Sequence, residues 1–129
     1  MPHRPAPDIV LLGAEWQPRA LLRAQLLEEG FDVVATDTWS DMRRQLRPGS
    51  KPLLAIVDLN GLPEPDRVLN DLRLLMKPHR VLVLVAMGTV PAAAVERLGF
   101  AVVSRPVAIK DVVTAAARVI EAAEAGGQS

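Results

Sequence analysis

Five short apolar runs alternate along this chain with segments whose apolar residues recur at helical spacing. The runs are residues 8–13, 31–36, 53–57, 81–85 and 101–104. Three of them, 8–13, 53–57 and 81–85, are nearly continuous in aliphatic residues, as is typical of strands buried on both faces of a sheet. Roughly 12–25 residues separate successive runs, which is the length of a helical crossover between parallel strands. The alternation therefore predicts one α/β domain built around a five-stranded parallel sheet.

The segments between these runs are predicted to be helices. They are residues 18–29, 40–46, a segment that opens at 63–66, and residues 90–98 and 109–125. Ser40 can cap the second helix, and the prolines at 63–66 suit the first turn of the third, where their missing amide hydrogen has no helical partner. The apolar residues that recur at helical spacing are Leu21, Leu22, Leu26 and Leu27 in the first helix, Val68, Leu69, Leu72 and Leu75 in the third, and Val112, Val113, Ala116, Val119 and Ile120 in the last.

Length and composition limit the class of protein. A chain of 129 residues forms one ordinary domain, which we place at 8–125 between tails at 1–7 and 126–129. Its 15 basic and 15 acidic residues balance, so bulk charge gives no reason to expect direct binding to nucleic acid. No apolar stretch approaches the roughly 20 residues of a membrane helix, and the amino terminus lacks the apolar core of a signal peptide. A cytoplasmic protein without membrane contact is expected.

The residues present also argue against several kinds of reactive site. The chain contains no cysteine, which excludes disulfides and thiolate metal ligands. Its two histidines, His3 and His79, lie far apart and lack acidic neighbours at ligand spacing, so no metal site is expected. No glycine-rich phosphate loop is complete, and neither histidine is placed for a serine triad. We therefore expect no catalytic residues and a protein that is not an enzyme.

Asp58 directly follows the third apolar run and is the main candidate for a functional residue. The carboxyl ends of parallel strands form the edge at which α/β proteins place their sites. Alternatively, an aspartate in this position has only a structural role and caps the loop that follows the strand. Both interpretations of Asp58 stay open at the level of the sequence.

The order of elements over residues 8–125 resembles the receiver domain of bacterial response regulators, which has a CheY-like, flavodoxin-like fold. Asp58 after the third strand and Ser104-Arg105-Pro106 after the fifth carry the resemblance. It implies a doubly wound (βα)5 sheet with strand order 2-1-3-4-5 and places Asp58 at the phosphoacceptor position. It also implies a cis peptide bond before Pro106, because receivers have a Lys-Pro pair there whose bond is usually cis.

The resemblance breaks down at the positions that bind magnesium in receivers. An acidic pair after the first strand joins the phosphoacceptor aspartate there, but this chain has Gly13 and Ala14, neither of which offers a side-chain ligand. Glu15 follows one residue later and is expected on a different side of the turn. With Asp58 as the only remaining carboxylate, no cofactor is expected and magnesium binding is not predicted.

Three further receiver positions are changed. Val85 stands where receivers have a threonine or serine that binds the phosphoryl group, and Val102 stands where they have an aromatic switch residue. Arg105 replaces the lysine that pairs with the phosphoryl oxygens, keeping the charge in a longer, forked side chain. It could form a bidentate pair with Asp58 or project into solvent. The set of changes indicates the atypical, pseudo-receiver subgroup.

The sequence thus predicts a receiver-like regulatory module of two-component or phosphorelay-type signalling that works by protein–protein interaction. The resemblance implies that a protein partner or a second copy docks on the face of the fourth helix, fifth strand and fifth helix. The candidate contacts are Ala93, Val95, Ala116 and Arg118. Two alternatives remain, namely a degenerate receiver that still takes phosphate on Asp58, and a flavodoxin-like domain that binds a small ligand above Gly13 and Asp58.

Overall fold

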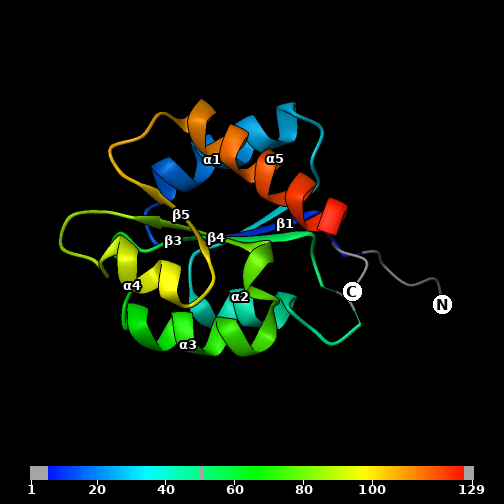
Figure 1. Ribbon diagram of the computed structural model, residues 1–129. Coiled ribbons are helices and arrows are strands. Elements are labelled where there is room, and N and C mark those ends of the chain that lie inside the picture. Colours follow the sequence, from blue (N-terminus) through cyan, green and yellow to red (C-terminus); the bar gives the residue numbers. More distant parts are fainter. Residues whose placement is uncertain (1–5, 50, 127–129) are drawn as a thin grey trace.

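The computed structural model describes residues 6–49 and 51–126, in which strands and helices alternate along the chain (Figure 1). The elements are β1 (Ile9–Gly13), α1 (Trp16–Glu28), β2 (Val33–Thr36), α2 (Trp39–Gln45), β3 (Leu54–Asp58), α3 (Pro65–Leu75), a short 3-10 helix η1 (Pro78–Arg80), β4 (Val81–Val85), α4 (Ala92–Arg97), β5 (Ala101–Ser104) and α5 (Ile109–Gly126). All strand pairs are parallel and the order is β2-β1-β3-β4-β5. The predicted fold class and strand order are confirmed.

Helices cover both faces of the sheet, with α1 and α5 on one side and α2, α3 and α4 on the other (Figure 1). Side chains alternate between the two faces along each strand. In β1, Ile9 and Leu11 pack in the cluster under α1 and α5, whereas Val10 and Leu12 pack in the cluster on the opposite face. Because both faces are covered, β1, β3 and β4 are buried at every position, which explains their continuous apolar sequence.

The ends of several elements differ from the predicted ones. Thr38, not Ser40, caps α2, because Thr38 has extended backbone and its hydroxyl accepts a hydrogen bond from the Asp41 amide at 3.2 Å. The helix α3 begins at Pro65, after Glu64, whose backbone lies in the left-handed region with φ of 47°. The predicted limits of β4 and β5 are confirmed.

Most of the residues predicted as tails, 1–5 and 127–129, lie outside the described residues, and Gly126 is the last residue of α5. In the part of the chain that the structure describes, no helix combines the length and apolar character needed to cross a membrane.

Candidate functional site

Asp58 is the last residue of β3, in register with Gly13 of β1 on one side and Leu84 of β4 on the other. This places its carboxylate at the carboxyl edge of the sheet, and the residue is only 7% exposed. Its Oδ1 accepts a hydrogen bond from the backbone amide of Asn60 at 3.1 Å, and its Oδ2 accepts one from Nη2 of Arg105. Both carboxylate oxygens are therefore engaged within the protein.

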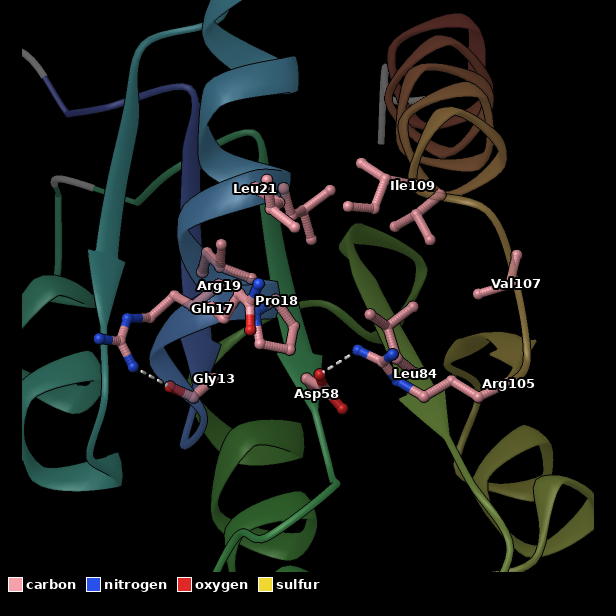
Figure 2. Close-up of a pocket in the computed structure, with 13 residues that line it drawn as sticks. Gly13, Gln17, Pro18, Arg19, Leu21, Asp58, Leu84, Arg105, Val107 and Ile109 are labelled. Atoms are coloured by element: carbon pink, nitrogen blue, oxygen red, sulfur yellow. Dashed lines mark hydrogen bonds and ion pairs between the residues drawn. The ribbon is translucent and has the colours of Figure 1, made fainter.

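Arg105 follows β5, and its side chain reaches over the end of β4 to Asp58 (Figure 2). Its backbone amide bonds to the carbonyl of Val85 at 2.8 Å, and the Arg105–Pro106 peptide bond is cis, as the resemblance implied. The side chain is 29% exposed, so the pair is partly shielded from water. Of the two alternatives that the sequence left open for Arg105, the ion pair is the one that forms.

The ion pair is not the bidentate fork that the sequence suggested. The described contact joins one guanidinium nitrogen, Nη2, to one carboxylate oxygen, and Nε of Arg105 is buried without a hydrogen-bond partner among the described residues. A buried donor without a partner has a free-energy cost. The guanidinium therefore neutralises Asp58 and keeps one donor, Nε, without a partner in the part of the chain that the structure describes.

At the positions of the acidic pair, Gly13 takes part in a contact that the sequence did not reveal. Its carbonyl accepts a hydrogen bond from Nη1 of Arg19 at 2.7 Å (Figure 2). A Cβ atom added at Gly13 would lie 3.3 Å from Cβ of Arg19, closer than side chains usually pack. A carboxylate at this position would therefore require Arg19 to move, while Ala14 simply lacks a ligand group.

Glu15 and Asn60 form an outer link to the site. Oε1 of Glu15 accepts a hydrogen bond from Nδ2 of Asn60 at 2.5 Å, and the amide of the same asparagine bonds to Asp58. The Glu15 carboxylate thus lies beside the site and is exposed. Sequence reasoning missed Asn60, although a residue two places after a strand-end aspartate is the usual donor to its carboxylate in a turn of this kind.

Val85 and Val102 leave the edge of the site apolar. Val85 is buried in the cluster that faces α2, α3 and α4, and Val102 packs against the same cluster. Neither side chain has a group that can donate to a phosphoryl oxygen. Both positions contribute to packing in this structure.

The donors at this edge do not fit a magnesium ion. Magnesium requires a near-octahedral set of oxygen ligands and gives up its water reluctantly. Gly13 and Ala14 supply no side-chain oxygen, Glu15 binds Asn60, and a guanidinium already lies on Asp58. Within residues 6–49 and 51–126, no group of three or more histidine, cysteine or acidic side chains could hold a metal ion.

A pocket of about 180 Å³ opens beside the Asp58–Arg105 pair, between α1, α5 and the sheet (Figure 2). It lies where the sequence allowed a ligand pocket near Gly13 and Asp58, and it extends further between the two helices. The lining residues are Leu11, Gly13, Gln17, Pro18, Arg19, Leu21, Leu22, Asp58, Leu84, Arg105, Val107, Ile109 and Val112.

The candidates for a protein contact are only partly exposed. Val95 and Ala116 are wrong as contact residues, because both are buried, Val95 in the cluster under α4 and Ala116 in the cluster under α5. Ala93 on α4 is exposed. Arg118 is exposed too, but it lines a groove with Gln25 of α1 and with Glu29, which directly follows α1. It therefore lies on the side of α5 that faces α1.

Comparison with known proteins establishes the fold. No family model and no curated protein matches the sequence. NtrX from Brucella abortus superposes with a TM-score of 0.80 at 19% identity, over 95% of this chain and 28% of that protein. The signal receiver domain of a protein assigned as a Luxo repressor from Vibrio parahaemolyticus gives 0.75 at 23% identity, over 94% of this chain and 95% of that one. A response regulator receiver domain protein from Clostridium thermocellum gives 0.74 at 19%, over 90% and 95%.

This chain therefore spans about 28% of the length of NtrX and nearly all of the two isolated receiver domains. At these identities the likeness defines the fold of the chain, which is the flavodoxin-like fold that response regulator receiver domains share.

Proposed function

We propose that this domain is a receiver-like regulatory module of bacterial two-component or phosphorelay-type signalling, of the pseudo-receiver kind. Its output is protein–protein interaction, and it catalyses no reaction. The observation that carries the proposal is the guanidinium of Arg105 on Asp58, at the strand end that the resemblance makes the phosphoacceptor position. The fold shared with receiver domains supports the signalling role.

The chemistry of phosphoryl transfer is the reason for excluding magnesium-dependent phosphorylation from this proposal. Transfer to a carboxylate needs a free oxygen as the nucleophile and cations that offset the charge on the moving group. Here Oδ2 of Asp58 is bound to Arg105 and Oδ1 to the amide of Asn60. An incoming phosphoryl group would have to break an existing ion pair, and no acidic pair is present to hold the metal. We infer that the Asp58 site stays in one conformation, with Asp58 paired to Arg105. Partner binding would then be constitutive and would not depend on phosphorylation.

Magnesium, alone or with beryllofluoride or acetyl phosphate, should leave the amide resonance of Asp58 and the fluorescence of Trp16 unchanged. Trp16 is exposed and follows Glu15 directly, so it lies near any metal bound at this edge. An NMR titration of wild type against Asp58→Asn separates a specific effect from ionic strength. A saturable shift at sub-millimolar magnesium that Asp58→Asn abolishes would instead establish the degenerate, phosphorylatable receiver.

For the partner, we propose the face formed by α4, β5 and α5. Strand β5 is an edge of the sheet, paired only with β4, and its residues Ala101, Val102 and Val103 are half-buried. An edge strand leaves backbone groups that a second chain can meet. Ala93 is the exposed residue of this face among the predicted contacts, since Val95 and Ala116 are buried.

The variant Ala93→Glu should weaken self-association or partner binding by roughly tenfold, about 1.4 kcal/mol, while the fold is retained. The matched control is Ala24→Glu, which adds the same charge at an exposed alanine on α1, on the other side of the sheet. Sedimentation velocity measures self-association, and capture from the native host measures partner binding. If both variants self-associate and bind partners as the wild type does, this face is not the binding surface.

A further inference from the structure

We propose that the pocket between α1 and α5 binds a small, uncharged apolar molecule, about the size of one aromatic ring or a branched alkyl chain. The proposal goes beyond the docking function, because it assigns a ligand to the domain. It does not depend on that function, since none of the residues proposed for docking lines the pocket.

The walls of the pocket are mostly aliphatic. Leu21 of α1 and Ile109 of α5 face one another across it, and the Asp58–Arg105 pair lies at one end (Figure 2). The remaining aliphatic walls are Leu11, Leu22, Leu84, Val107 and Val112. An apolar cavity of about 150 Å³ accommodates benzene. A pocket of about 180 Å³ therefore has room for a molecule with a single ring.

The charged side chains of the pocket leave no net charge facing its interior. Asp58 and Arg105 neutralise one another in an ion pair. The guanidinium of Arg19 points out of the pocket and donates to the carbonyl of Gly13 at 2.7 Å, so its charge lies outside (Figure 2). A charged ligand of either sign would lose its hydration here and meet no opposite charge in exchange.

The hydrogen-bonding groups at the polar end of the pocket are engaged within the protein or inaccessible. Oδ1 of Asp58 accepts from the amide of Asn60, and its Oδ2 accepts from Nη2 of Arg105. Nε of Arg105 is buried, with no surface through which a ligand could reach it. A polar ligand would therefore gain little, and burial of apolar surface is the interaction that this pocket offers.

Leu21 makes the pocket accessible from solvent. It is 49% exposed and lies at the rim, whereas Leu11 and Leu84, which belong to the sheet, are each 1% exposed. A small molecule can therefore enter past Leu21 without the core being opened. Once bound, it would cover apolar surface that is otherwise in contact with water, which is favourable.

Three molecules with the same ring test the class of ligand. Toluene is uncharged, benzoate is an anion and benzylamine is a cation. With methyl groups labelled for NMR, toluene should shift Leu21, Leu84 and Ile109 saturably. It should bind at least about tenfold more tightly than either ion, because each ion loses hydration in the pocket without gaining a charged partner. A ratio below about tenfold, shifts that do not saturate, or shifts spread outside the pocket would overturn the proposal.

Variants at the rim locate the binding. Leu21→Trp fills the pocket and should abolish the toluene shifts of Leu84 and Ile109, whereas Leu27→Trp, on the same helix but outside the pocket, should leave them unchanged. Toluene should also raise the urea midpoint of the wild type and of Leu27→Trp, but not that of Leu21→Trp, because a ligand that binds only the folded state stabilises it.

A milder substitution keeps the test decisive if Leu21→Trp does not fold. Leu21→Gln removes one apolar wall at an exposed position and should weaken toluene at least about threefold relative to Leu27→Gln. Toluene binding that is unchanged by substitution of Leu21 would contradict the assignment, while the magnesium and Ala93→Glu results would stand.

Discussion

Replacing Leu26 by alanine should lower the free energy of unfolding by about 2–5 kcal/mol, the largest effect that we expect from a single substitution in α1. Leu26 is 0% exposed and packs in the cluster between the sheet, α1 and α5. Truncation removes buried methyl groups and leaves a cavity that the surrounding strands can fill only in part.

The neighbouring Leu27→Ala is the matched control. Leu27 is 40% exposed, so the same chemical change should cost less than about 1 kcal/mol. Urea denaturation followed by circular dichroism gives both values, and unchanged m-values would show that the denatured states are comparable. Similar costs at the two positions would mean that α1 presents a different face to the sheet from the one described.

The leucines of α1 show where sequence reasoning on this fold reaches its limit. Leu21, Leu22, Leu26 and Leu27 all recur at helical spacing, but only Leu22 and Leu26 are buried. Apolar residues around most of the helix give a weak periodic signal, so the pattern establishes a helix without identifying its inner face. The same limit explains Val95 on α4 and Ala116 on α5, because alanine and valine suit either a buried or an exposed position of a helix.

The elements that were predicted well are those whose sequence is constrained on both faces. The limits of β4 are set by five consecutive buried positions. The strand order is the one that the resemblance to receiver domains implied. The position of Asp58 follows from the end of such a strand. By contrast, the hydrogen bonds from Arg19 to the backbone of Gly13 and from Asn60 to the side chain of Glu15 span loops, and no local pattern encodes loop geometry of this kind.

The ion pair could be anticipated only as one of two outcomes. Arginine is long enough to reach solvent or the carboxylate, and the choice depends on how deeply Asp58 is buried. A carboxylate that is nearly inaccessible to water requires a compensating partner, which favours the paired form. The resemblance contributed the position of Arg105 above the strand end. Burial, which only the structure supplies, explains why the pair forms.

Arg105→Ala should therefore destabilise the domain by about 2–3 kcal/mol. Removing one partner of a fully buried pair costs about 3–5 kcal/mol, and the effect is smaller here because the arginine side chain is 29% exposed. The loss leaves the Asp58 carboxylate with the amide of Asn60 as its remaining described donor. Asp58→Asn should cost less, because the amide oxygen can still accept a hydrogen bond and no charge is left buried.

A double-mutant cycle measures the pair itself. The variant that combines Asp58→Asn with Arg105→Ala should be more stable than the sum of the two single changes predicts. The reason is that Asp58→Asn removes the carboxylate charge that Arg105→Ala leaves without a partner. Arg97→Ala, at an exposed arginine in the last turn of α4, is the control for loss of an arginine alone and should stay within about 0.5 kcal/mol of wild type. Additive single costs, or an Arg105→Ala variant as stable as Arg97→Ala, would mean that the contact does not hold Asp58. The constitutive, unphosphorylated state proposed for this domain would then lose its physical basis.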